Sequence, residues 1–220
     1  MKKILPLLLL ASCASPSGSP AGSGLSDAEF ETQMASVIQF DPALVRAGEK
    51  VVYFVKRQGE NQTQTHSLAA VGEEGAALWI ERKVPHDAGF MVVKSKIDRT
   101  GKLLEQWVGE PGGSPGKTYP HPRKSEEPPV RRDSSGAKAD SKNEPDSVVL
   151  GGKTYTCTRV TTVLNYPDGR RSTMVNWFSK EVPFPASSEL GGLVKRQFGR
   201  LTMDLAFSSP TGAQPDLMIK

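Results

Sequence analysis

The sequence predicts a mainly β protein of the α+β class, with one curled antiparallel sheet of about nine or ten strands and one N-terminal amphipathic helix. Three observations lead to this fold class. Short runs of alternating apolar residues follow one another from residue 50 onward, separated by the turn-forming stretches GENQ, GEEG, PHDAG and DRTG. Residues 26–40 carry apolar side chains at helical spacing. Residues 109–146 interrupt the strand pattern with a stretch poor in aliphatic side chains.

The first twelve residues have the layout of a secretion signal. Lys2 and Lys3 form a basic start, residues 4–10 are apolar apart from Pro6, and small residues follow. Such a run is too short to remain in a bilayer as a spanning helix. We therefore assign residues 1–12 to a signal peptide and exclude them from the fold.

The end of this signal, Leu10-Ala11-Ser12-Cys13, resembles the lipobox of bacterial lipoproteins at all four positions. The resemblance implies cleavage after Ser12 and a diacylglyceryl group on the thiol of Cys13, the nucleophile that this chemistry needs. Each buried methylene contributes about 0.8 kcal/mol, so the two or three palmitate-like chains implied for Cys13 hold a protein stably on a membrane. The residue after the anchor is Ala14. In the proteobacterial lipoproteins that this chain resembles, an Asp at that position would favour retention in the inner membrane. We expect an envelope protein anchored in the outer membrane and facing the periplasm.

Residues 13–25 are small and polar and predict a lipidated, flexible tether. If Cys13 is acylated, the second cysteine, Cys157, has no partner within the chain, and we expect no disulfide. Cys157 lies in the β-like run TYTCTRV, where a single thiol most often acts as a small buried hydrophobe. No histidine lies close to it in sequence, which argues against a reactive thiol.

The helix begins at a capping box. Ser26-Asp27-Ala28-Glu29 has the Ser-x-x-Glu form, and apolar residues follow at helical spacing at Phe30, Met34, Val37 and Ile38. The helix should end near Phe40, because Asp41-Pro42 opposes its continuation.

The strands are expected in two groups, 26–108 and 147–210, that form a single β-rich domain. Either group alone would leave a half-formed sheet with exposed edges. Both faces are apolar at 51–55 and at 90–93, which predicts that part of the sheet is covered on two sides by the helix and by the curl of the sheet. The last strand alternates between an apolar and a more polar face, with Leu201, Met203, Leu205 and Phe207 on the apolar one. Between the groups, 109–146 is rich in Pro, Gly, Ser and mixed charge and predicts a disordered insertion.

Composition and motifs argue against several classes of function. Removing Lys2 and Lys3 from the 220-residue chain leaves 26 basic against 24 acidic residues, a net charge of +2, so no nucleic-acid partner is expected. His66, His86 and His121 have no metal-type spacing, and the carboxylate pairs fall in predicted turns or the insertion. GxxxxGK[ST] and CxxC motifs are absent, and the stretch GGSPG at 112–116 falls in the insertion, so no GxSxG elbow between a strand and a helix is expected. We expect no catalytic residues, no metal, no cofactor and no enzyme activity.

Three stretches, GGKTYTCTRV, NWFSKEVPF and GGLVKRQFG, resemble the closing strands of the Lol-pathway lipoprotein carrier and acceptor proteins. The resemblance implies an unclosed β-barrel with a helix over an apolar concavity, and a hydrophobic cleft that binds a lipid, an acyl chain or a lipoprotein. The alternative is a non-enzymatic envelope interaction or scaffold protein whose insertion or VPFPASSELGG loop contacts an unknown envelope protein. An envelope hydrolase would require a buried carboxylate or histidine cluster in a cleft.

The anchor gives a first prediction. Cys13→Ser should release the protein from membranes, because the substituted residue cannot form the thioether. Cell fractionation followed by mass determination of the N-terminal peptide checks this outcome. A variant that stays membrane-bound and uncleaved, or a wild-type chain with Cys13 bonded to Cys157, would contradict the lipoprotein interpretation.

Overall fold

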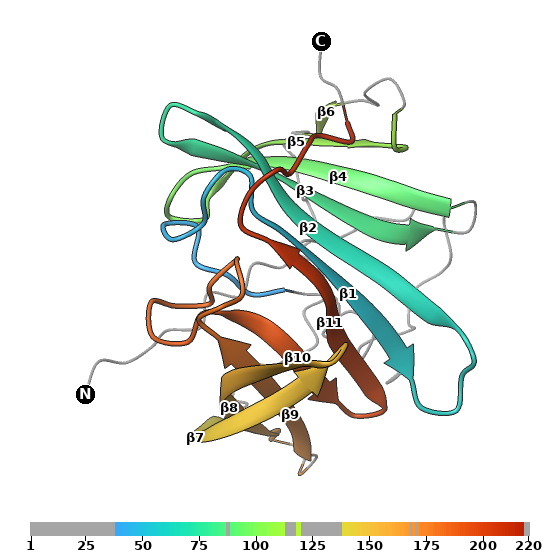
Figure 1. Ribbon diagram of the computed structural model, residues 1–220, viewed down its shortest axis with the longest axis vertical. Helices are drawn as coiled ribbons and strands as arrows, with labels where there is room; N and C mark the ends of the chain where they lie inside the picture. Colours follow the sequence, from blue (N-terminus) through green and yellow to red (C-terminus); the bar gives the residue numbers. More distant parts are fainter. Residues whose placement is uncertain are drawn as a thin grey trace.

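The first and last strands, β1 (Lys50–Arg57) and β11 (Leu201–Ser209), pair with each other in the middle of one sheet (Figure 1). The computed structural model describes residues 38–86, 89–112, 118–119, 138–167, 169 and 171–217. The other strands are β2 (Thr63–Glu74), β3 (Ala77–His86), β4 (Gly89–Ile97), β5 (Leu103–Gly109), β6 (Thr118–Tyr119), β7 (Lys138–Leu150), β8 (Lys153–Asn165), β9 (Arg171–Ser179) and β10 (Gly192–Phe198).

The sheet consists of two antiparallel meanders joined back to back. The strand order is β6-β5-β4-β3-β2-β1-β11-β10-β9-β8-β7, so each half extends outward from the central β1–β11 pair. The far end of the second half curls back until β7 contacts β11, yet within the described residues β6 and β7 remain the two edges (Figure 1). The predicted fold class, a curled and unclosed antiparallel sheet, is confirmed.

The structure corrects the extent of the predicted disordered insertion. Residues 138–146 form the first part of β7 and pair with β8 along their whole length. Cross-strand contacts support this strand, because Arg159 Nη2 lies 2.7 Å from a carboxylate oxygen of Glu144 and the Trp177 indole donates to Asp146 over 2.9 Å. Disorder was predicted because this stretch has few aliphatic side chains to bury. Backbone pairing with β8 and cross-strand contacts between charged side chains stabilise the strand instead. Residues 118–119 also pair, as β6, while 113–117 and 120–137 lie outside the described residues.

The predicted N-terminal helix lies outside the described residues up to position 37. Residues 38–40 are described and are not helical. Ile38 and Phe40 nevertheless pack against the hydrophobic core, and the Phe40 ring meets the Phe184 ring edge-on at 5.4 Å between centroids.

The core lies on one face of the central strands, as period-two alternation requires. Its members there are Val51, Tyr53, Val55, Leu68, Ala70, Leu78, Ile80, Leu201, Met203 and Leu205. The prediction that Phe207 shares this face is wrong, because its side chain is 53% exposed. A register shift pairs Val52 with Phe207 but Tyr53 with Leu205, and such a bulge changes the face on which the following side chains lie.

Coverage of the opposite, outer face differs between strands. In β1 the predicted two-sided burial fails, since Phe54 is 46% exposed. In β4 it holds for the neighbours Val92 and Val93, which are both buried, but fails at Phe90, which is 44% exposed. The cover found over β3 and β4 is the C-terminal segment, residues 213–217, which leaves β11 and runs across the sheet toward β4 and β5 (Figure 1).

Several polar side chains are buried on the inner face. The Tyr53 hydroxyl donates to the Leu193 carbonyl over 2.9 Å, and Arg196 Nε donates to the Asn176 side-chain oxygen over 2.6 Å. Burial raises the pKa of Tyr53 and lowers the pKa of Arg196 to about 10. His66, opposite Tyr53 in the β1–β2 register, has one ring nitrogen 3.4 Å from Gln64 Oε1, and its Nδ1 finds no hydrogen-bond partner among the described residues.

The buried imidazole should make stability depend on pH. Burial, helped by the charge of Arg82, lowers the pKa of His66 from 6.5 to about 4. Between these two pKa values the unfolded chain binds a proton that the folded chain does not, so the free energy of unfolding should fall by about 1.4 kcal/mol per pH unit as the pH drops. The loss reaches roughly 3 kcal/mol near pH 4, and this contribution vanishes above about pH 7.

Urea unfolding of the wild type and His66→Gln between pH 7.5 and 4.5 checks this prediction. The stability curve of the variant should be flatter over that range, because its side chain does not titrate. Parallel curves for the two proteins would contradict it.

Candidate functional site

The sequence-predicted site residue, Cys13, lies outside the described residues, as does His121. His86 is the last residue of β3, and His66 is buried in β2. In the part of the chain that the structure describes, no three His, Cys, Asp or Glu side chains gather as a metal-binding group. The same residues contain no helix of the length and apolarity needed to cross a membrane.

A groove of about 510 Å³ opens where β7, β8 and β9 meet the loop between β9 and β10. Most of its exposed lining surface is apolar, and charged groups stand among the lining residues. The lining residues are Asn143, Glu144, Pro145, Thr156, Cys157, Thr158, Phe178, Ser179, Lys180, Glu181, Glu189 and Leu190. A second groove of about 410 Å³ lies against other residues of the same loop, including Val182, Pro183, Pro185 and Gly191.

The β9–β10 loop, residues 180–191, is fixed by its own hydrogen bonds. The Ala186 amide donates to the Gly191 carbonyl over 2.7 Å, and the Ser187 hydroxyl oxygen accepts from the amides of Glu189 and Leu190. Asp41 adds a bond from outside the loop, because its amide donates to the Pro185 carbonyl over 2.8 Å. A loop held in this way presents one shape to solvent.

Phe184 anchors the loop in the protein. Its side chain is 1% exposed, and its backbone lies in the left-handed region with a φ of 58°, which a non-glycine residue rarely adopts. The buried carboxylate of Glu49 holds this conformation by accepting the Phe184 amide over 3.2 Å. Strained backbone of this kind persists where surrounding contacts determine it, and it concentrates at binding and active sites.

Gly191 and Gly192 close the loop through a tight approach of two backbones. A Cβ at Gly192 would lie 2.1 Å from the Pro183 carbonyl oxygen, and one at Gly191 would lie 2.2 Å from the Ser179 carbonyl oxygen. The VPFPASSELGG loop was predicted as a candidate contact, but its sequence carries no signal for this packing, because the packing depends on how the two ends of the loop meet in space.

Cys157 lies in the groove and is 5% exposed, as a free thiol. Burial, followed by the charge of Asp146, raises the pKa of its thiol to about 11, and Sγ lies 3.4 Å from the Tyr155 carbonyl oxygen. The thiol is therefore protonated near neutral pH, and its expected role as a small buried hydrophobe is confirmed.

Two of the groove carboxylates are held in ion pairs. Glu144 pairs with Lys142 and Arg159, whose contacts hold the pKa of its carboxyl below the usual value. Glu181 lies 3.0 Å from Lys153 Nζ. Glu189 is exposed at the rim. The groove thus combines an apolar lining with a border of largely paired charges, at which the Glu189 carboxylate is exposed.

These features define the protein as an unclosed, curled antiparallel sheet with a structured loop beside an open groove. No protein-family model and no curated protein matches the chain. The Pseudomonas aeruginosa MucA/MucB complex is similar with a TM-score of 0.43 and 13% identity, covering 84% of this chain and 58% of that chain. MucB in complex with periplasmic MucA gives 0.42 and 13%, covering 81% and 55%.

A candidate lipoprotein from Parabacteroides distasonis is also similar, with a TM-score of 0.35 and 11% identity, covering 78% of this chain and 99% of that one. This chain spans little more than half the length of the MucB chains. Structural similarity at these TM-scores assigns neither a family nor a function.

Gly192→Ala tests whether the loop is fixed by backbone packing. The added methyl group meets carbonyl oxygens that cannot move independently, so we expect the free energy of unfolding to fall by about 1–3 kcal/mol. Gly72→Ala is the matched control, because nothing lies within 4 Å of a Cβ there. Equal denaturation midpoints for the two variants would show that the loop is free to move away.

Proposed function

We propose that the protein is a bacterial envelope lipoprotein, anchored through Cys13, that binds a segment of a partner protein in the groove beside the β9–β10 loop. The role is binding rather than catalysis. The thiol in the groove is held protonated, and the carboxylates of Glu144 and Glu181 are engaged in ion pairs.

The preorganised loop is the observation that carries this proposal. The loop contains several features that cost free energy on folding. They are the left-handed backbone of Phe184, the buried carboxylate of Glu49 that fixes it, and the closely packed Gly191 and Gly192. They hold Leu190 and Glu189 beside the groove in a fixed arrangement. Fixing a surface before binding reduces the entropy lost when a partner docks.

The chemistry of the groove favours a protein segment over an acyl chain. An apolar centre with a charged and hydroxyl-bearing border is the usual anatomy of a protein interface. Pockets for small apolar ligands enclose most of the ligand surface, whereas this groove is open to solvent. The exposed carboxylate of Glu189 at the rim further favours a segment that presents an apolar side chain next to a basic residue.

The tether supports action at the membrane surface. Thirteen residues, 13–25, separate the anchor from the predicted start of the folded part, and fully extended they would reach on the order of 40 Å. A flexible coil of this length would average about 20 Å. A tether of this kind would let the groove meet a partner that lies close to the bilayer.

Photo-crosslinking in intact cells tests the partner. A photoreactive amino acid in place of the exposed groove residue Lys180 should give one discrete protein adduct, and the same probe at Asn61, in the β1–β2 turn, should give none. Glu189→Arg should reduce the Lys180 adduct several-fold by reversing charge at the border. Glu60→Arg, an exposed change far from the groove, should leave it unchanged.

A lipid ligand is the competing outcome, and native mass spectrometry of residues 24–220 detects it. A co-purifying lipid together with no protein adduct at position 180 would overturn the proposal in favour of acyl-chain binding. Equal adduct yields in the Glu189→Arg and Glu60→Arg variants would show that the groove does not form the contact.

A further inference from the structure

Glu81 and Lys94 form an ion pair in an unexpected place. They lie opposite each other in β3 and β4, with Nζ 3.2 Å from a carboxylate oxygen, and alternation puts them on the outer face, away from the core residue Ile80. Side chains on that face of a sheet are normally in water, yet these are only 4% and 9% exposed. The chain segment that covers them is 213–217.

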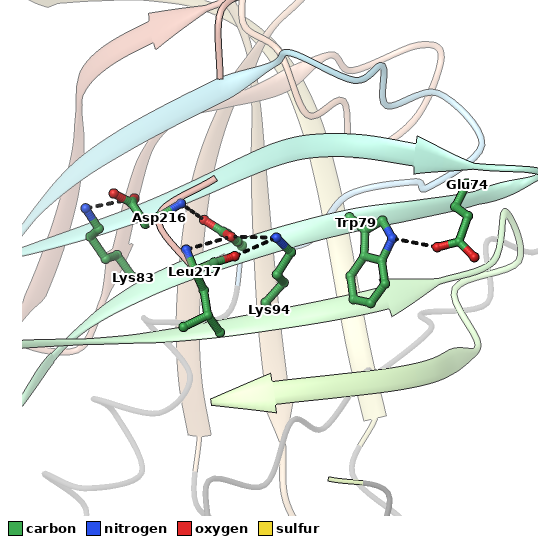
Figure 2. Close-up of polar contacts among 7 residues, drawn as sticks. Glu74, Trp79, Lys83, Lys94, Asp216 and Leu217 are labelled. Carbon is green, nitrogen blue, oxygen red and sulfur yellow. Dashed lines mark hydrogen bonds and ion pairs between the residues drawn. The ribbon is translucent and has the colours of Figure 1, made fainter. Parts of the chain in front are cut away.

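The pair binds this segment through its main chain, as Figure 2 shows. The Glu81 carboxylate accepts the amide of Asp216 over 2.6 Å and the amide of Leu217 over 3.2 Å. Lys94 donates to the Leu217 carbonyl over 2.8 Å. The two consecutive amides point to the same carboxylate because the backbone bends at these residues. Any peptide with this bend offers the same main-chain groups, and hydrogen bonds to charged partners are the stronger kind.

The side chains of the segment add selectivity. The Asp216 carboxylate lies 2.8 Å from Lys83 Nζ at the partly exposed rim of the site. Leu217 is completely buried. The site therefore holds an acidic residue followed directly by an aliphatic one, at a bend of the backbone.

The segment is attached to the sheet without being one of its strands. It begins where the Ala213 amide donates to the Gly48 carbonyl over 2.9 Å, and the Asp216 carbonyl accepts the Gly112 amide over 2.9 Å. A Cβ at Gly48 would stand 3.3 Å from the Thr211 backbone, so this close approach favours glycine. If the segment left, Glu81 and Lys94 would stay paired and regain water, which avoids the penalty of one buried charge without its partner.

We propose that the outer face of β3 and β4 is a peptide-binding site for a bent Asp-Leu type segment, occupied by the protein's own residues 216–217. A polypeptide with an acidic residue followed by an aliphatic one can take the place of this segment in trans. The site does not involve the groove beside the β9–β10 loop, so the two proposals stand or fall separately.

The test uses the full chain with a weakened segment and an intact site. Asp216→Asn combined with Leu217→Ser should bind a fluorescent, end-capped peptide TGAQPDL at least ten-fold more tightly than the wild type does, because the wild-type segment competes in cis. Fluorescence anisotropy measures the binding. The same peptide with Asn and Ser at the last two positions should not bind.

Charge exchange identifies the site. Adding Lys83→Glu to the weakened chain should abolish binding of TGAQPDL and restore binding to TGAQPKL. Glu81→Gln with Lys94→Met should abolish binding of both peptides by removing the main-chain contacts. A folded, weakened chain that binds neither peptide, or binds both equally, would overturn the proposal.

Hydrogen exchange of the wild-type chain provides a measurement that does not depend on the variants folding. If the segment opens locally, the amides of Asp216 and Leu217 should exchange at least ten-fold faster than those of Lys94 and its neighbours in β4. Exchange of all these amides at one common rate would mean that the segment leaves only on global unfolding, and the site could not accept another peptide.

Discussion

The pairing of β1 with β11 is the contact on which the rest of the structure depends. It joins two meanders, and without it each would end in an exposed central edge beside an incomplete core. The pair brings Lys50 against Ser209, residues from opposite ends of the described chain, so its formation carries a large loop-closure cost. Burial of Tyr53, whose hydroxyl reaches the Leu193 carbonyl in the other meander, helps to offset that cost.

The groove and the C-terminal site both follow from this central pair. Because β11 lies next to β1, the segment that leaves β11 can cross to β3 and β4 and cover Glu81 and Lys94. Because β10 follows β11 in the sheet, the β9–β10 loop reaches Glu49 just before β1, which fixes Phe184. One sheet thereby carries the two separate surfaces that we propose for polypeptide binding, one open and the other covered by the protein's own C-terminal segment.

The sequence predicted those parts of the fold that period-two alternation determines, namely the long strands and the inner core. The prediction from alternation failed at Phe207, because a β-bulge places its side chain on the other face of the sheet. The prediction of disorder failed in 138–146, because strand pairing and charged contacts stabilise this segment without apolar burial. The assignment of Cys13 rests on a four-residue local motif and stays a prediction, because this residue lies outside the described part of the chain. The groove and the Asp216–Leu217 contacts could not be predicted, because they arise where segments distant in sequence meet, and neither segment has a periodic pattern of its own.

The long edge strand β7 has a consequence for how the protein behaves in a crowded compartment. An edge strand of this length, paired on one side by β8, is a template on which a neighbouring molecule could add its own strand and start fibre growth. Its sequence, KADSKNEPDSVVL, opposes that reaction, because alternating charges resist desolvation and Pro145 offers no amide for an incoming strand. The hydrophilic composition of β7, which predicted disorder, thus opposes strand addition at this edge of the unclosed sheet.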